Sequence, residues 1–228
     1  MILTGSMCAG SVRYYAACVE AGVVAVDTAE VRLPLRHSHH RYAIAGPNGV
    51  QQLTVPLVGE TNAMPVPMRD VRISEHASWR RLHWGALFSA YGRSPYFDYI
   101  APDLEAIVMG HQQWLLDYNE QMQQLIVDFM DLPVEMVRAC DIDTSGATDL
   151  RGKIGTKKPD RLPIVDVPYY QVWQERHGFL PGLSILDLLM NTGREGIITL
   201  MKMSKTINID IIVNNVNNVN NDNNERIK

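Results

Sequence analysis

Cysteine is scarce in this sequence, and its pattern excludes two kinds of protein. The three cysteines are Cys8, Cys18 and Cys140, and no two of them have Cys-x-x-Cys spacing. Neither a disulfide framework nor a cysteine zinc site is therefore indicated. Sparse cysteines fit a reducing compartment, so we expect a cytoplasmic protein.

Long apolar runs and nucleotide-binding motifs are absent as well. No apolar stretch approaches the roughly 18 residues that a membrane-spanning helix needs. Residues 1–11 have neither the basic start nor the long apolar segment of a secretory signal. The phosphate-loop and dinucleotide-binding glycine motifs do not occur, so no cofactor can be identified from the sequence. The net charge of −4 gives no reason to expect binding to nucleic acid or to a membrane surface.

Lysine is missing from residues 32–93, which hold eight arginines, five of the seven histidines and only three acids. Residues 103–149 reverse this balance, with ten acids and a single base, Arg138. One interpretation is a face that binds a small anionic substrate, such as a sugar nucleotide or an activated acyl donor. The other is a solvated surface on which the charges happen to segregate.

The first half of the chain predicts a strand–helix–strand unit and a hairpin. Residues 2–4 and the β-branched run 23–27 indicate strands, and Gly22 ends a helix over 12–21. Such a crossover favours a parallel strand pair. A Gly-Pro-Asn-Gly turn separates two further strands, the second of which is expected at a sheet edge because Pro56 lacks an N–H.

The second half is predicted to be mainly helical. The expected elements are a strand over 70–74, a helix over 79–91 capped by Ser78, one long helix over 102–131, a strand over 134–142, a polar loop over 143–168, and helices over 184–193 and 194–203. Eight asparagines in residues 214–224 predict a disordered tail. We therefore expect an α/β fold with a small mixed sheet, as a single domain over 1–203 followed by a low-complexity tail over 204–228.

Three segments together resemble the WbqC-like protein family. They are His40-Arg-Tyr-Ala-Ile44 with Leu53-Thr-Val-Pro56, Trp79-x-x-x-His83-Trp84 with Ser94-Pro-Tyr-Phe97, and Tyr170-Gln-Val-Trp173 with Gly178-Phe-Leu-Pro181 and Leu183-Ser-Ile-Leu-Asp-Leu-Leu189. The resemblance implies a role in surface polysaccharide biosynthesis, notably of O-antigen. It also implies the transfer of a glycyl or other small acyl group onto a sugar. The family's usual start is replaced here by Thr4-Gly-Ser-Met-Cys-Ala-Gly10, and its Lys/Gln-rich run by Leu35-Arg-His-Ser-His39.

Two residues are candidates for acid–base catalysis. His83 lies on the apolar stripe of its predicted helix, where it is either a core histidine with one buried partner or a general base. Asp187 follows Ser184 by three residues, which indicates reciprocal helix capping. Its leucine neighbours also predict a raised pKa if the carboxyl is buried, and this suits acid–base work.

Five residues are candidates for substrate binding. His40 and Arg41 are placed to hold an anionic group, and Arg151 and Lys158 flank a glycine-containing loop that could close over a phosphate. Tyr91 belongs to an aromatic group that either stacks on a sugar or packs in the core. His37 and His39 share one face of an extended strand, but no third ligand is visible, so we predict no metal site.

Two hypotheses follow from these residues. In the first, the protein is a transferase in which His83 or Asp187 acts as general base and Arg41 and Arg151 hold anionic groups. In the second, it is a non-catalytic accessory protein that binds an anionic glycan with the same basic face.

Overall fold

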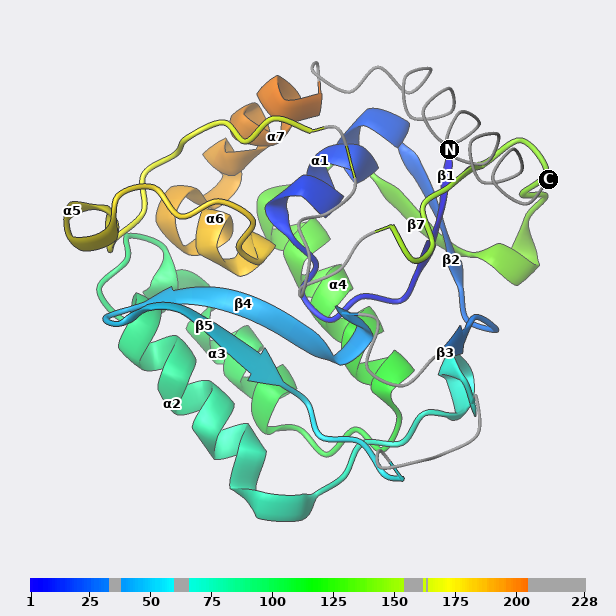
Figure 1. Cartoon of the computed structure of the whole chain (residues 1–228), viewed down its shortest axis with the longest axis horizontal. Coiled ribbons are helices and arrows are strands. Elements are labelled where there is room, and N and C mark those ends of the chain that lie inside the picture. Colours follow the sequence, from blue (N-terminus) through cyan, green and yellow to red (C-terminus); the bar gives the residue numbers. More distant parts are fainter. Residues whose placement is uncertain (33–37, 60–65, 154–161, 163, 205–228) are drawn as a thin grey trace, which may run out of the picture.

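The computed structural model describes residues 1–32, 38–59, 66–153, 162 and 164–204 (Figure 1). The chain opens with β1 (Ile2–Gly5), α1 (Val12–Ala21) and β2 (Val23–Asp27), and β1 pairs with β2 in parallel. The predicted strand–helix–strand unit is thus confirmed. The Ser11 hydroxyl caps α1 by accepting a hydrogen bond from the Tyr14 N–H.

The main sheet has four parallel strands in the order β7-β2-β1-β8. Strand β7 (Glu135–Arg138) is shorter than the strand predicted over 134–142, because a 3₁₀ turn over Ala139–Asp141 follows it. Strand β8 (Thr148–Asp149) lies inside the stretch predicted to be a polar loop. Two residues without apolar alternation give no strand signal, so only the pairing with β1 identifies β8.

The predicted hairpin forms, but it is not part of the main sheet. Strands β4 (Arg41–Gly46) and β5 (Gly49–Thr54) make a separate two-stranded antiparallel sheet. Both strands of a two-stranded sheet are edge strands, as predicted for the second one, but the hairpin does not join the β1-β2 strands in one mixed sheet. The buried side chains of Tyr42 and Ile44 belong to the hydrophobic core, and β4 packs against helices α2 (Trp79–Tyr91) and α6 (Ile185–Thr192) and not against the main sheet.

A second small sheet pairs β3 (Val31–Arg32) with β6 (Val66–Pro67). The strand predicted over 70–74 is absent. A 3₁₀ turn over Met68–Asp70 is followed by single bridges from Arg72 and Ile73 to two different segments.

The helix predicted over 102–131 is two helices, α3 (Phe97–Met109) and α4 (Leu115–Met130). Gly110 leaves helical geometry with ψ 170°, and the buried Arg80 side chain donates to the freed carbonyl of Val108. Apolar spacing persists across the break, so periodicity alone could not reveal it. The prediction of one long helix was wrong for this reason.

The remaining helices are α2 (Trp79–Tyr91), the single turn α5 (Gln174–His177), α6 (Ile185–Thr192) and α7 (Gly196–Ser204). Helix α2 has the predicted bounds, but the Ser78 side chain does not cap it, since φ of Ser78 is 41°. Helix α4 runs through the middle of the molecule, between the parallel sheet and the hairpin (Figure 1). The predicted Asn-rich tail lies outside the described residues apart from Ser204.

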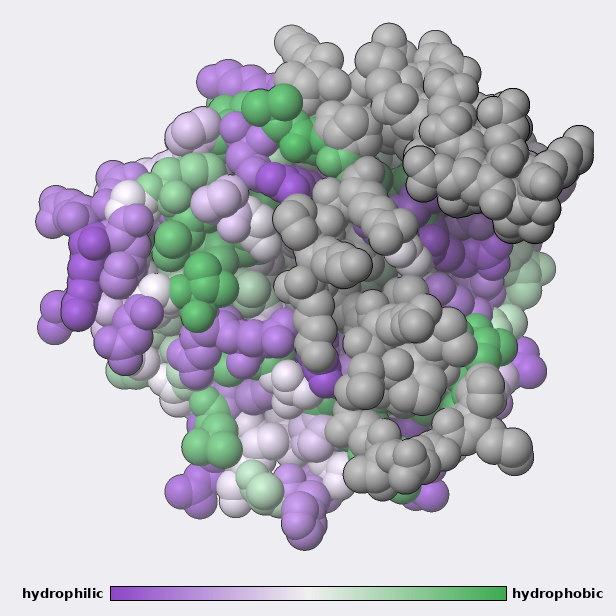
Figure 2. All heavy atoms as spheres, in the orientation of Figure 1, coloured by the Kyte–Doolittle hydropathy of each residue, from purple (hydrophilic) through white to green (hydrophobic). Residues whose placement is uncertain are grey.

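One hydrophobic cluster joins these elements. It includes Tyr14 and Cys18 of α1, Met122 of α4 and the five apolar residues of α6. The face in Figure 2 shows polar and apolar side chains interleaved in small patches. Among the described residues, no helix has the length and apolar character needed to cross a membrane. The division into a domain and a tail stays a prediction.

Two glycines give opposite predictions for stability. Gly193 ends α6 with φ 56°, and an added Cβ would lie 2.5 Å from Cδ1 of Tyr96. We expect Gly193→Ala to lower the free energy of unfolding by about 2 kcal/mol or more, because the backbone is strained and the ring must move. Urea denaturation measures this.

Gly85→Ala is the matched control. Gly85 is exposed inside α2, and an added Cβ would meet nothing within 4 Å. This change should raise the free energy of unfolding by about 0.5–1 kcal/mol, since glycine is costly inside a helix. Equal effects of the two substitutions would contradict the described geometry.

Candidate functional site

The carboxyl ends of the four parallel strands meet at one edge of the main sheet. Strands β1, β2 and β8 end there at Gly5, Asp27 and Asp149. In open parallel sheets ligands bind outside this edge. The residues that gather there therefore form the candidate site.

The usual phosphate position of such folds is closed. The amide of Val12, at the start of α1, donates to the carbonyl of Leu183 at 2.9 Å. The Ser184 hydroxyl donates to the carbonyl of Ala9, and the Ile185 amide donates to Gly10. The segment before α6 thus bonds to the loop between β1 and α1, and a pyrophosphate has no access to these groups.

An open pocket of about 240 Å³ lies at the same edge. It is lined by Ser6, Val26, Glu120, Gln123, Gln124, Met136, Val137 and Arg138. The apolar members come from β2 and β7, and the one glutamate and the two glutamines come from α4. The Arg138 guanidinium donates two hydrogen bonds to the Glu120 carboxylate, at 3.1 and 2.9 Å. The charges in the pocket therefore cancel.

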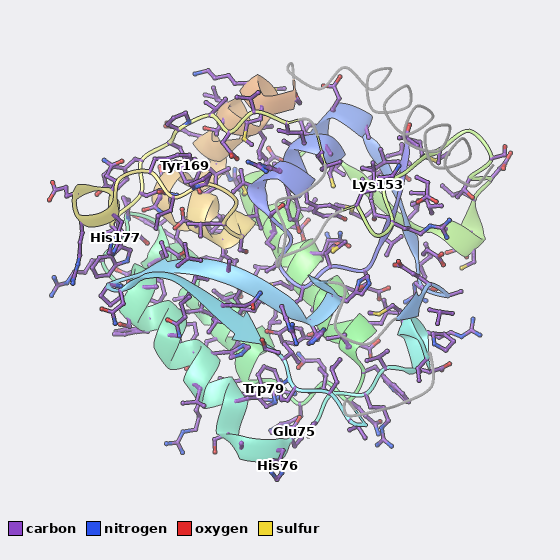
Figure 3. The ribbon with its side chains drawn as sticks, viewed as in Figure 1. Glu75, His76, Trp79, Lys153, Tyr169 and His177 are labelled. Atoms are coloured by element: carbon purple, nitrogen blue, oxygen red, sulfur yellow. The ribbon has the colours of Figure 1, made fainter. Side chains whose placement is uncertain are left out.

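Arg151, predicted to hold an anionic group, is also neutralised. Its guanidinium forms ion pairs with Asp27 at 2.6 Å and with Asp149 at 2.7 Å. These hydrogen bonds raise the pKa of Arg151. Lys153 donates to the carbonyl of Asp149 at 2.5 Å (Figure 3). The two cations that follow β8 are thus bound by the protein itself.

A glutamate and a histidine meet beside Gly5. The Nδ1–H of His39 donates to the carbonyl of Ser6 at 2.5 Å, and its Nε2 lies 3.7 Å from Oε2 of Glu30. Burial raises the pKa of Glu30 to about 7, with a further contribution from the Asp27 charge. The Asn119 amide donates to the Ser6 hydroxyl at 2.9 Å and to the His39 carbonyl at 2.8 Å.

Sequence reasoning missed Glu30, Ser6 and Asn119. It singled out His39 only as a member of a histidine cluster. The position of Ser6 two residues after the strand predicted over 2–4 was the available signal, because strand ends in parallel sheets carry ligand groups. Asn119 lies on a helix that was predicted in one piece, and nothing in its spacing indicated a contact with residue 6.

His83 is buried and has both ring nitrogens engaged. Its Nε2–H donates to the carbonyl of Thr54 at 3.1 Å, so Nδ1 accepts from the Tyr42 hydroxyl at 3.3 Å. Burial lowers the pKa of His83 to about 4, with a smaller effect from the charge of Arg80. The imidazole is therefore neutral at pH 7 and already hydrogen-bonded on both sides.

Asp187 is fully buried and accepts hydrogen bonds from three side chains. The donors are Tyr91 at 2.9 Å, Tyr169 at 2.7 Å and Gln171 at 2.9 Å. The predicted reciprocal cap is wrong in this respect, since Ser184 caps α6 alone through the Leu186 N–H. Burial raises the pKa of Asp187, and the three donors oppose that rise. The structure thus unites two predicted site residues, Tyr91 and Asp187.

The other predicted residues are placed separately. No hydrogen bond or ion pair within the described ranges joins His83, Asp187, Arg41 and Arg151 to one another. His40 is buried, and Nε of Arg41 is buried without a hydrogen-bond partner among the residues that the structure covers. Lys158 and His37 lie outside those residues. No group of three or more potential metal ligands occurs within them either.

Comparison with known proteins gives one family. Residues 17–157, more than half of the chain, match the model of the WbqC-like protein family. Searches of curated proteins and of solved structures gave no match.

The three hydrogen bonds to Asp187 predict that substitutions at the neighbouring residues Tyr169 and Tyr170 differ in their effect on stability. Tyr169→Phe removes a hydrogen bond to a buried carboxylate and should lower the free energy of unfolding by about 1.5–3 kcal/mol. Tyr170→Phe removes an exposed hydroxyl one residue away and should change it by less than about 0.5 kcal/mol. Chemical denaturation of both variants tests this, and equal losses would contradict it.

His83 predicts acid sensitivity. Its pKa is depressed in the folded state, so its contribution to stability is complete above about pH 6.5 and is lost as the pH falls towards 4. Between pH 6.5 and pH 4 the free energy of unfolding of the wild type should fall by about 3 kcal/mol more than that of His83→Gln. His76→Gln, at an exposed histidine, should keep the wild-type pH dependence. Urea denaturation at several pH values measures the free energy of unfolding, and parallel pH profiles for wild type and His83→Gln would contradict this prediction.

Proposed function

Because the chain belongs to the WbqC-like protein family, we propose that it is a transferase of surface polysaccharide biosynthesis that attaches a glycyl or other small acyl group to a sugar. The observation that carries the proposal is the pocket at the carboxyl edge of the parallel sheet. We propose the cytoplasm, where activated donors are made, as the place of the reaction.

The pocket suits a neutral, polar ring. Gln124 offers an amide, Ser6 a hydroxyl, and the Arg138–Glu120 pair offers further donors and acceptors without a net charge. Val26 and the β7 side chains supply apolar surface for a sugar ring face. The volume of about 240 Å³ is just below the range of about 300–1,000 Å³ typical of drug-sized ligands, so one sugar residue fits.

The transfer needs a nucleophile and a base. A sugar hydroxyl or amine attacks the acyl carbonyl, and a side chain near neutrality removes its proton. His83 and Asp187 remain predictions for this role, and both are buried in hydrogen-bonded clusters. Our candidate for holding an anionic group of the donor is Arg41, because its buried Nε has no hydrogen-bond partner among the described residues.

The burial of His83 and Asp187 favours a second candidate function. If neither reaches a substrate, the chain is a non-catalytic accessory protein that binds a glycan. Removal of His83 separates the two: turnover collapses if His83 is the base, whereas glycan affinity stays nearly unchanged in both cases.

The proposal predicts binding of neutral saccharides. Neutral hexoses and N-acetylhexosamines should raise the melting temperature of the full chain, because a ligand that binds the folded state stabilises it. Gln124→Trp, which fills the pocket, should weaken this binding by about tenfold or more. Calorimetric titration measures the affinity, and mass spectrometry of mixtures with aminoacyl and acyl donors measures transfer.

Gln121→Trp is the matched control, since Gln121 is exposed on the same helix but does not line the pocket. It should bind saccharides as the wild type does. Saccharide binding that survives Gln124→Trp would place the sugar elsewhere, and absence of any transfer product would favour the accessory function.

A further inference from the structure

The acid–base group at the carboxyl edge is not among the residues proposed above for catalysis. We infer that Glu30 is the residue that exchanges a proton with a ligand bound at this edge, and that His39 is the positioning residue behind it. The inference rests on the proposed function only for the identity of the acceptor.

The orientation of His39 is fixed by the backbone. A carbonyl oxygen can only accept, so the hydrogen bond to Ser6 places a proton on Nδ1 of His39 and leaves Nε2 facing Glu30. At 3.7 Å these two atoms are too far apart for a direct hydrogen bond, so His39 influences Glu30 through its charge. A protonated imidazole stabilises the Glu30 carboxylate, and a neutral imidazole does not.

The pair lies tightly against β1. At Gly5, an added Cβ would be 2.7 Å from Cε1 of His39 and would also overlap the Glu30 carboxyl group. The carbonyl of Ser6 accepts from His39, and Ser6 also lines the pocket, so the pair adjoins the proposed ligand site through Ser6 without lining it. The side chain of His39 is 1% exposed and that of Glu30 is 13% exposed, which makes Glu30 the member that a ligand can reach.

The charges around Glu30 come from three elements. Asp27 ends β2, Asp149 ends β8, and Arg151 binds both of them, while His39 faces the carboxyl group from the 3₁₀ turn Ser38–His40. Burial and the two aspartates raise the pKa of Glu30, Arg151 lowers it, and the result is about 7. A base with this pKa is matched to work at neutral pH.

The step that Glu30 performs is a proton transfer. As the acceptor oxygen or nitrogen bonds to the acyl carbon, Glu30 takes its proton, and the carbonyl electron pair moves onto oxygen. When that pair returns, the bond to the donor's leaving group breaks. The proton on Glu30 then passes to the leaving group.

The first test is carboxyl-carbon NMR of the full chain labelled at glutamate, with Glu30 assigned from the spectrum of Glu30→Gln. We expect Glu30 to titrate near pH 7 and its midpoint to fall in His39→Gln, because an amide can donate to the carboxylate and favour its charged form. A wild-type midpoint in the ordinary range of glutamate would overturn the inference.

The second test uses 4-nitrophenyl acetate as acyl donor and water as acceptor. The wild-type rate should rise with pH through the Glu30 midpoint, and Glu30→Gln should lower it by about a hundredfold. His39→Gln should move the midpoint of the rate profile downwards, which a merely structural role would not do. Glu105→Gln, at an exposed glutamate of α3, should leave the rate unchanged.

We expect Glu30→Gln to fold, because the substitution removes no charge that the folded state favours. A raised pKa means that the folded state favours protonated Glu30, so stability is lost as pH rises from about 4.5 to 7. Glutamine resembles the protonated form, and Glu30→Gln should melt at or above the wild-type temperature at pH 8. Equal ester hydrolysis by wild type and Glu30→Gln would overturn the inference. Because the ester needs no sugar, that result is independent of whether sugars prove to be the acceptors.

Discussion

Asp187 is a carboxylate buried at 0% exposure, and four parts of the chain are arranged around it. It sits in α6 and receives hydrogen bonds from Tyr91 at the end of α2 and from Tyr169 and Gln171 in the segment before α5. The Tyr91 hydroxyl in turn accepts from the Ala45 amide of β4, which ties the hairpin to the same cluster. A buried carboxylate is tolerated only when donors surround it, so these four segments constrain one another's positions.

Contacts between distant segments, such as those of Asp187, separate the elements that the sequence predicted from those that it did not. Elements whose pattern is local were predicted almost to the residue, such as α1 with its Gly22 stop and α2 with its end at Tyr91. The family resemblance was also correct. Elements defined by distant partners were missed: β8 exists only because it pairs with β1, and the break after α3 depends on Arg80. The capping role assigned to the Asp187 side chain failed because its donors lie up to 96 residues away.

The candidate site shows the same division. His83 and Asp187 were chosen for residue type and apolar surroundings, and those surroundings are what withdraws them from solvent. Arg151 was chosen for charge, but the aspartates that end β2 and β8 neutralise it. The residues that gather at the edge of the parallel sheet come from strand ends, a 3₁₀ turn and the middle of α4. No sequence spacing relates them, and only the sheet order brings them together.

The bonding of residues 183–185 to the loop after β1 bears on how the molecule divides. The family match covers 17–157, and it excludes both β1 and α6. A fragment trimmed to those limits would lose a central strand of the parallel sheet together with the backbone partners that cover the start of α1. We therefore expect that residues 17–157 would not fold on their own in this chain, because the segments on both sides of this range complete the sheet and cover the start of α1.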